Sequence, residues 1–460
     1  MLGHFHAGRT ETRTKHMPDQ QVFPMAEQLD QQVITLMPLD TNAKEGRYSM
    51  IAACFNFVNS IIGSGIIGLP YALNQAGLPC GLLLLIMVAF VTDYTIILLI
   101  RGGNLSGTDS YQSLVRSTFG FPGYFILSAL QFLYPFIAMI SYNITTGDTL
   151  TKVLERLPGV GPDHILANRH FVIILTTLLC TLPLSLYRNI QKLGKVSFMS
   201  VVLTGIILVI VIIRAATLGP QIPPTQDAWV FARQNAIQAV GVMSFAFICH
   251  HNSFLIYGSL AEPTLTHWTQ VTHISVGTSL AISAVFALGG YVTFTGYTQG
   301  DIFENFCRDD NLAAAGRFCF GVSIITTFPL ECFVTREVVS HAVGGRELSG
   351  LEHTSLTLII VAACTAISLA YDCLGIVLEL NGAVSATPLI FIIPSACYLK
   401  LSSGRWYHRD HWIPALLILM GVLVMVSSLT MTFLGPRDCS HGADFFYCGE
   451  ANVSATLPPL

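Results

Sequence analysis

Residues 55–77 read FNFVNSIIGSGIIGLPYALNQAG, and this stretch decides the fold. It is apolar enough to cross a bilayer, yet Gly63, Gly65 and Gly68 lie in its middle and Pro70 follows them. In a helix interior, a glycine costs about 1 kcal/mol relative to alanine and a proline about 3 kcal/mol. Lipid offers no hydrogen bonds, so a broken backbone inside a membrane must line a cavity in the protein or bind something. The stretch therefore predicts a membrane helix that is broken at its centre and lines a transport site.

The composition places the rest of the chain in a membrane as well. The 460 residues are 52% hydrophobic and 11% charged, whereas soluble domains carry roughly 25% charged residues. Mean hydropathy is +0.60, and long apolar windows recur from residue 51 to residue 434. We therefore expect an all-α polytopic membrane protein. The sequence has no Gly-rich phosphate loop, HExxH or GxSxG motif, so we expect no enzyme, no cofactor and no nucleic-acid partner.

Eleven apolar spans are expected, and the first of them is broken. They cover about 48–77, 80–101, 122–147, 170–187, 193–216, 233–260, 270–297, 312–335, 354–371, 375–399 and 412–434. The first five spans and the next five occupy blocks of nearly equal length. Because five is odd, the second block enters the membrane from the opposite side, as in an inverted repeat. The predicted organisation is a disordered cytoplasmic tail (1–47), five-helix repeats (48–216 and 233–399) joined by an outer loop (217–232), an eleventh helix (400–434) and an outer tail (435–460).

If the two blocks are related, the sixth span should be broken where the first is. Residues 244–260 read SFAFICHHNSFLIYGSL, in which His250, His251, Asn252 and Ser253 interrupt an otherwise apolar helix. Polar groups at membrane depth are costly unless they have partners. Ordinary hydrogen bonding between helices is one explanation for them. An unwound binding segment explains them better, because four polar residues gather at the symmetry-related position.

The two breaks indicate how a zwitterion would bind. A half-helix that begins near Gly65 presents backbone N–H groups and the positive end of its dipole to a carboxylate. The half-helix that ends near Asn59 presents carbonyls to a cation. The Asn59 side chain adds an amide oxygen suited to Na⁺, although a hydrogen bond between helices is the alternative for it. The candidate substrate-binding residues are Ile62, Gly63, Ser64, Gly65, Phe247, His250, His251 and Asn252.

The eighth span places hydroxyl groups beside a proline. Ser323, Thr326 and Thr327 precede Pro329, which frees a backbone carbonyl four residues back. Carbonyls and hydroxyls together would form an oxygen cage for Na⁺. A proline kink in which the threonines bond back to their own helix is an equally good explanation.

Three carboxylates, Asp93, Glu331 and Glu379, lie inside predicted spans. An acid within the membrane is an ion-site or proton-relay candidate by default, and Asp93 and Glu331 are our proton-relay candidates. Pairing with a nearby basic group is the alternative for both. No acid lies within the two breaks, which favours a neutral zwitterion over a substrate with a cationic side chain.

Loop charges orient the chain. With the N-terminus inside, fifteen Lys and Arg residues fall on the inner side and six on the outer side, so a cytoplasmic N-terminus is predicted. An odd number of spans then puts the C-terminus outside or in a lumen. We expect glycosylation at Asn452 there and a disulfide between Cys439 and Cys448, with Cys307 left over. The other cysteines lie in apolar windows and are predicted to be core residues.

Three motifs carry a resemblance to a known family. They are GSGIIGLPYAL (63–73), FAFICHHN (245–252) and NGAVSATPLIFIIPSACYLK (381–400). With these motifs in the expected order, residues 48–435 resemble the sodium-coupled neutral amino acid transporters of the amino acid/auxin permease group. The resemblance implies a LeuT-like 5+5 inverted repeat with an eleventh transmembrane helix, and Na⁺-coupled symport of neutral amino acids across a lipid bilayer. It also implies that Asn59, Thr326 and Thr327 match the family's Na⁺ site.

The chain departs from the better-known plasma-membrane members at two places. Their fifth and sixth spans are joined by a long glycosylated loop, whereas 217–232 is short and has no sequon or cysteine. Their sixth span has Pro-Glu after the first His, where this chain has His251 and Asn252. The substrate therefore does not carry over, and plasma membrane or lysosome both stay open. The alternatives to Na⁺ symport are a proton-coupled amino acid carrier, since histidines titrate near physiological pH, and a transceptor that senses an amino acid and signals through its N-terminal tail.

Overall fold

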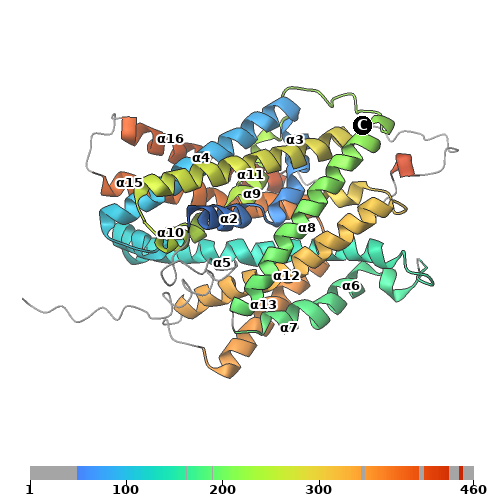
Figure 1. Cartoon of the computed structure of the whole chain (residues 1–460), viewed down its shortest axis with the longest axis horizontal. Helices are drawn as coiled ribbons and strands as arrows, with labels where there is room; N and C mark the ends of the chain where they lie inside the picture. Colours follow the sequence, from blue (N-terminus) through green and yellow to red (C-terminus); the bar gives the residue numbers. More distant parts are fainter. Residues whose placement is uncertain are drawn as a thin grey trace, which may run out of the picture.

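The structure, a computed structural model, describes residues 49–161, 163–188, 190–342, 348–402, 409–434 and 445–448. Within these ranges every regular element is a helix (Figure 1). The helices are α2 (Met50–Ile61), η1 (Ser64–Gly68), α3 (Leu69–Ala76), α4 (Leu78–Ser106), α5 (Tyr111–Leu154), η2 (Ile165–Ala167), α6 (Arg169–Thr176), η3 (Thr177–Thr181), α7 (Leu182–Ser185), α8 (Ile190–Thr217), η4 (Gly219–Gln221), α9 (Ala236–Phe247), α10 (His250–Ser259), α11 (Leu265–Phe294), η5 (Thr295–Tyr297), η6 (Ile302–Asn305), α12 (Asn311–Ala342), α13 (Gly350–Ala370), α14 (Leu374–Asn381), η7 (Gly382–Ala386), η8 (Pro388–Ile392), α15 (Ile393–Leu401), α16 (Arg409–Leu434) and η9 (Phe446–Cys448).

Nine helical segments of the described chain are long enough to cross a bilayer. In the described part of the chain, nine helices have the length and apolar composition of a membrane span. The bent pair α2 and α3 makes a tenth if it counts as one span, and Arg169–Ser185 is a shorter apolar helix. These segments fall where the sequence predicts spans. A total of eleven spans is reached only if the bent pair and Arg169–Ser185 both cross the membrane, so eleven spans stays a prediction.

The first span is broken at the predicted place. Its first half, α2, ends at Ile61, and Gly63 is extended with φ −111° and ψ −153°. The chain then continues as the 3-10 helix η1 into α3, and the two halves meet at 52°. Pro70 lies in the first turn of α3, where the missing N–H of proline has no helical partner to lose.

The second break lies two residues earlier than predicted. The backbone leaves α9 at Ile248, with φ −72° and ψ 121°, and at Cys249, with φ −144° and ψ 6°. His250–Ser253 form the first turn of α10, so the prediction that these four residues are unwound is wrong. They are helical because the Cys249 carbonyl accepts bonds from the Asn252 N–H at 3.0 Å and the Ser253 hydroxyl at 3.3 Å, which closes that turn.

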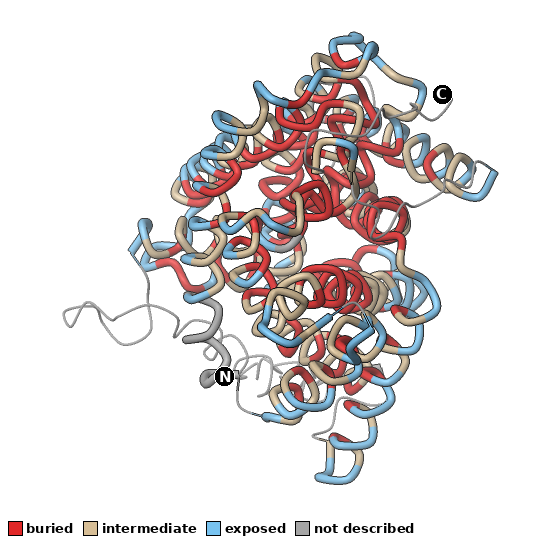
Figure 2. The backbone as a smooth tube through the Cα atoms, turned by 90° about the vertical axis from the view of Figure 1, so that its right-hand side faces the viewer, coloured by how far each residue is buried: buried red, intermediate tan, exposed pale blue. Residues whose placement is uncertain are grey.

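The second broken span and the α3 half of the first lie in the interior of the bundle. In the α9–α10 segment 83% of the apolar window is buried, against 22% in α8 and in α16. Figure 2 shows the buried segments in the middle of the molecule and the exposed ones around them. Glycines bring the backbones close, because a Cβ at Gly382 would lie 1.8 Å from the Gly241 carbonyl oxygen. Close approach of this kind is what small residues provide between membrane helices.

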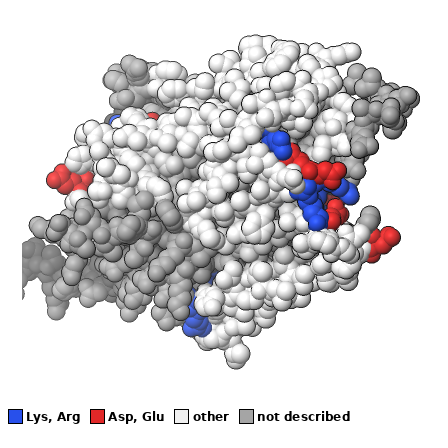
Figure 3. Space-filling view, turned by 45° about the vertical axis from the view of Figure 1, so that its right-hand side comes forward, with Lys and Arg blue, Asp and Glu red and all other residues white. Residues whose placement is uncertain are grey.

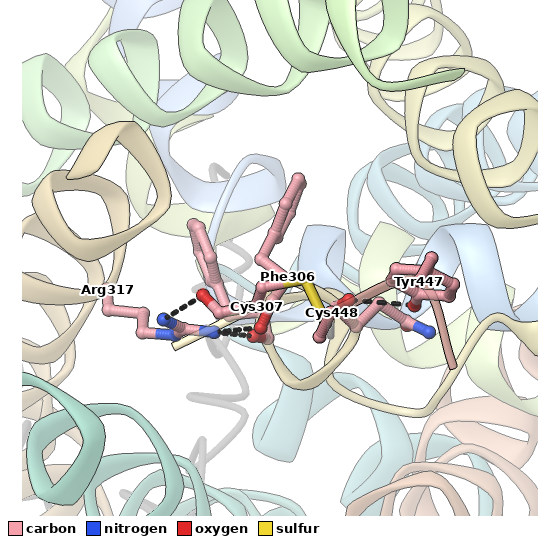
Figure 4. Close-up of a disulfide and its surroundings, with 7 residues drawn as sticks. Phe306, Cys307, Arg317, Tyr447 and Cys448 are labelled. Atoms are coloured by element: carbon pink, nitrogen blue, oxygen red, sulfur yellow. Dashed lines mark hydrogen bonds between the residues drawn. A yellow bond between two sulfur atoms is a disulfide. The ribbon is translucent and has the colours of Figure 1, made fainter. Parts of the chain in front are cut away.

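The disulfide prediction is wrong. Cys448 bonds to Cys307, 141 residues away in sequence (Figure 4). The fold brings the two together because η9 packs on the loop that holds Cys307, where Tyr447 donates to the Asn305 carbonyl at 2.8 Å. Cys373, predicted to be a core residue, is buried and is also disulfide-bonded. Cys439 and the glycosylation candidate Asn452 lie outside the described residues.

Candidate substrate and ion site

The three glycines of the first break have different surroundings. A Cβ at Gly63 would meet nothing within 4 Å, whereas one at Gly65 would lie 2.7 Å from the Cα of Ala246. At Gly68 it would lie 2.6 Å from Leu378. Gly63 is therefore the glycine that leaves a ligand room beside the backbone. Gly65 and Gly68 instead allow the broken span to pack on α9 and α14.

The start of α10 contacts the end of α2. The Asn252 side-chain amide donates to the Ser60 hydroxyl at 2.7 Å. Ser60 lies one residue before Ile61, the last residue of α2. The structure thus brings together the two breaks that the sequence predicts as halves of one site. Ile62 is half-buried, and the described backbone of Ser64 begins η1.

His250 is an anchor between helices as well as a site candidate. Its side chain is fully buried and its Nε2 atom lies 2.9 Å from the Thr95 hydroxyl of α4. That hydroxyl donates its own hydrogen to the Val91 carbonyl at 2.7 Å, so it accepts from Nε2–H and assigns the tautomer. The Nδ1 atom is then an acceptor, and it has no hydrogen-bond partner among the described residues. His250 keeps one ring nitrogen available to an N–H donor.

His251 lies in a row of aromatic and polar side chains. Its ring centroid is 5.7 Å from that of Tyr134 on α5, which is 5.7 Å from Phe245. Tyr134 also interacts electrostatically with Glu331 of α12, toward which Tyr142 donates at 3.5 Å. Tyr134 therefore packs against His251 and lies within electrostatic range of Glu331.

Phe247 and Asp93 have other surroundings. The Phe247 side chain is fully buried in the core at the end of α9. Asp93 pairs with His273 of α11, with 2.7 Å between Oδ2 and Nδ1, and the His273 side chain is 58% exposed. Asp93 thus has a basic partner, which was the alternative to a relay role. The pair lies at the periphery of the bundle, away from Glu331.

The hydroxyls proposed for Na⁺ bond within α12 and to α8. Thr326 and Thr327 both donate to the Ser323 carbonyl at 2.8 Å. The Ser323 hydroxyl lies 2.5 Å from that of Ser200. This is the pattern of a helix that bonds back onto itself around an internal proline. Asn59 lies half-buried in the last turn of α2, and the Na⁺ site stays a prediction.

Sequence reasoning missed several residues that hold the breaks in place. Ser60 and Thr95 each bond to a polar residue of the second break. Tyr71 of α3 donates to Glu379 of α14 at 3.3 Å, and Glu379 is 1% exposed. Glu379 itself was already a candidate as an acid inside a predicted span, whereas its partner Tyr71 was not. Nothing in the local sequence singles out the two hydroxyl partners.

Known proteins resemble this chain over most of its length. A family model for transmembrane amino acid transporter proteins matches residues 46–434. A Danio rerio protein named "Putative sodium-coupled neutral amino acid transporter 11" is 69% identical over 417 residues, which are 90% of this chain and 93% of that protein. The Homo sapiens protein of that name is 59% identical over 384 residues, 84% and 95% of the two chains. Vacuolar amino acid transporter 2 of Saccharomyces cerevisiae is 32% identical over 418 residues, 87% and 86%.

Solved structures show the same fold. A manganese transporter from Eremococcus coleocola superposes with a TM-score of 0.55 at 14% identity, over 87% of this chain and 92% of that one. At this identity the likeness concerns the fold alone. It confirms the expected LeuT-like, all-helical membrane architecture.

Proposed function

The chain belongs to the transmembrane amino acid transporter family, and on that premise we propose that it carries neutral amino acids in symport with Na⁺ by alternating access. The observation that carries the proposal is the contact between the two helix breaks. Asn252 bonds to Ser60 across them, and Gly63 has open space beside it. A small ligand placed there would touch four half-helix ends at once.

Those ends suit the two charges of an amino acid. The starts of η1 and α10 present N–H groups and the positive end of a helix dipole, which favours the carboxylate. The ends of α2 and α9 present carbonyls, which favour the ammonium group and Na⁺. The described residues 62–65 and 248–253 include no acid or Lys or Arg, which supports a substrate with a neutral side chain.

Sodium coupling rests on relatives and on energetics. The relatives from fish and human carry sodium coupling in their printed names. At 100 mV each transported charge contributes about 2.3 kcal/mol, enough for nearly 50-fold accumulation of the substrate. We retain Asn59, Ser323, Thr326 and Thr327 as proposed Na⁺ ligands.

Purified protein in liposomes tests the proposal. Labelled neutral amino acids would be offered with an inward Na⁺ gradient, with an inward H⁺ gradient, or with neither. We expect uptake above the equilibrium level only with the Na⁺ gradient, and more of it with a negative interior. Accumulation driven by H⁺ in the absence of Na⁺ would overturn Na⁺ coupling, and no uptake of any amino acid would overturn the transport proposal.

Proton coupling is the second candidate, because the row from His251 through Tyr134 to Glu331 places titratable groups next to a break. In that case Glu331→Gln would abolish uptake driven by a proton gradient while leaving exchange of substrate across the membrane intact. Under Na⁺ symport the same variant keeps its Na⁺-driven accumulation.

The proposed orientation has a cytoplasmic N-terminus. Cys307 lies between η6 and α12, and Cys448 lies after α16. Their disulfide is at the end of the bundle that the loop charges predict to be outer. Disulfides persist in oxidising compartments, which supports that orientation. Fusing a tag that is read by antibody to each terminus and staining cells before and after permeabilisation tests it.

A further inference from the structure

Residues 298–310, here called the outer loop, connect α11 to α12 and are tied to the bundle on two sides. Arg317 of α12 is fully buried and donates to the carbonyls of Phe303, Phe306 and Cys307 (Figure 4). On the other side, the disulfide joins the loop to Cys448 of η9. The outer loop is therefore an ordered part of the bundle in this conformation.

Three buried carboxylates interact electrostatically where the outer loop packs on the bundle. Asp301 and Glu304 belong to the loop and Asp148 to α5, and their exposed fractions are 2%, 9% and 6%. One oxygen of each is bonded: Asp301 accepts from the Phe303 N–H at 2.8 Å, Glu304 pairs with Lys152 at 2.8 Å, and Asp148 pairs with Arg169. The second oxygen of each is buried and has no hydrogen-bond partner among the described residues. Leaving such buried groups without a hydrogen-bond partner destabilises the folded state.

The basic side chains near the three carboxylates do not pair with all three of them. Figure 3 shows basic and acidic side chains crowded at one end of an otherwise largely uncharged surface. The groups that face Asp301 or its acidic neighbours come from four elements: Asp148 and Lys152 (α5), Arg169 (α6), Glu304 (η6) and Arg317 (α12). Lys152 and Arg169 are each paired with another acid, and Arg317 directs N–H groups at carbonyls. Among these three carboxylates, Asp301 is thus the one without a hydrogen-bonded cation in the described structure.

The free oxygens do not form a metal site. No group of three or more His, Cys, Asp or Glu side chains in the described residues is arranged to hold a metal ion. Lys152 and Arg169 each pair with one of the two neighbouring acids. A proton is the ligand that remains, because it needs only one buried oxygen and removes the charge that is left over.

We propose that Asp148, Asp301 and Glu304 form a proton-binding site in which Asp301 carries the proton, and that this proton holds the outer loop against the bundle. Burial, and next the negative charge of Glu304, raise the pKa of the Asp301 carboxyl to about 7, although the Phe303 N–H, Lys152 and Arg317 oppose them. Released into water, the same carboxyl would have a pKa of about 3.9.

The sign of the pH effect follows from these two states. The docked loop binds more protons than the released loop between pH 4 and 7, so acid favours docking. Docking strengthens up to about tenfold for each pH unit as pH falls through this window. Above pH 7 Asp301 is ionised in both states, and the pH dependence from this group disappears. Docking of the loop does not depend on the proposed transport function. Only its consequence rests on the proposed alternating access: acid on this side would favour a closed outer mouth.

Hydrogen–deuterium exchange of the full-length protein in lipid nanodiscs tests the proposal without any transported substrate. After correction for intrinsic exchange, peptides covering 302–310 should be about 25-fold better protected at pH 5.5 than at pH 7.5, given the two pKa values. Asp301→Asn removes the titrating group and should remove this dependence. Asp309→Asn, in the same loop but exposed, should keep it.

Other results would overturn the proposal. These are a wild-type loop with equal protection at both pH values, or a pH dependence that survives in Asp301→Asn. Glu304→Gln provides a second reading should Asp301→Asn fold poorly, because loss of the Glu304 charge should move the midpoint to lower pH. An unmoved midpoint would contradict the shared site. Since exchange needs no transport, its outcome is distinct from success or failure of the liposome experiment.

Discussion

The side chain of Asn252 donates a hydrogen bond of 2.7 Å to the hydroxyl of Ser60. One residue belongs to the first turn of α10 and the other to the last turns of α2, so this bond spans the two places where membrane helices are interrupted. The residues are 192 positions apart in sequence. If the two breaks form one site, this bond sets the distance between its halves, and its loss should change substrate affinity before it changes folding.

A double-mutant cycle at this pair is the first prediction. Asn252→Ala and Ser60→Ala should each raise the substrate concentration for half-maximal uptake about fivefold, since a buried hydrogen bond contributes about 1 kcal/mol. The double variant should be no worse than either single variant, because both remove the same bond. Initial rates in liposomes measure this. Strictly additive effects would mean that the bond does not act between the two sites.

Two neighbouring glycines should respond differently to a methyl group. Gly65→Ala should lower the free energy of unfolding by about 1–3 kcal/mol. Its Cβ would lie 2.7 Å from the Ala246 backbone, where the packed core leaves no room for it. Gly63→Ala should fold normally but lose uptake, because the methyl group would enter the space beside the break. Gly205→Ala in peripheral α8 has equally open surroundings and is the matched control. Melting by size-exclusion chromatography separates the two effects, and equal stability of the Gly65 and Gly63 variants would refute the assignment.

The contact of His250 with Thr95 gives a stability prediction. Thr95→Val keeps the shape of the side chain but removes the acceptor of a fully buried Nε2–H. An unsatisfied buried donor costs about 1–3 kcal/mol, so the melting temperature should fall. Thr95→Ser keeps the hydroxyl and should stay near the wild type. A Thr95→Val protein as stable as the Thr95→Ser protein would show that the ring nitrogen finds another partner.

Residues with known backbone preferences made the first break predictable. The second break has no such residues, so its predicted position was wrong by two residues. Glycines and a proline mark the first break directly. The second opens at Ile248 and Cys249, apolar residues with no intrinsic tendency to end a helix, and the polar residues after them close the next turn instead. The partners Thr95 and Cys307 were out of reach for another reason. Each is joined to its partner over more than a hundred residues, so only the folded chain brings them together.

The disulfide offers a chemical test of the fold at the end of the bundle where residues 298–310 lie. Digestion without reductant should yield one cross-linked peptide that contains Cys307 and Cys448. Cys439→Ser should leave that peptide unchanged, because Cys439 is not the partner of Cys448. Mass spectrometry of the digest measures this directly. A Cys439–Cys448 peptide in the wild-type digest would restore the prediction from sequence and contradict the structure.

The proposed Na⁺ ligands can be separated from the proline kink. Asn59→Ala should raise the Na⁺ concentration for half-maximal uptake at least tenfold, or abolish Na⁺ dependence, because an amide oxygen is lost next to the break. Thr326 is the harder case, since its hydroxyl already donates to the Ser323 carbonyl, which leaves its oxygen lone pairs free to accept a cation. Thr326→Ser should then keep the wild-type Na⁺ response and Thr326→Val should weaken it. If Thr326→Val responds to Na⁺ as the wild type does while Asn59→Ala does not, the hydroxyl belongs to the kink, and the site is built by α2 without it.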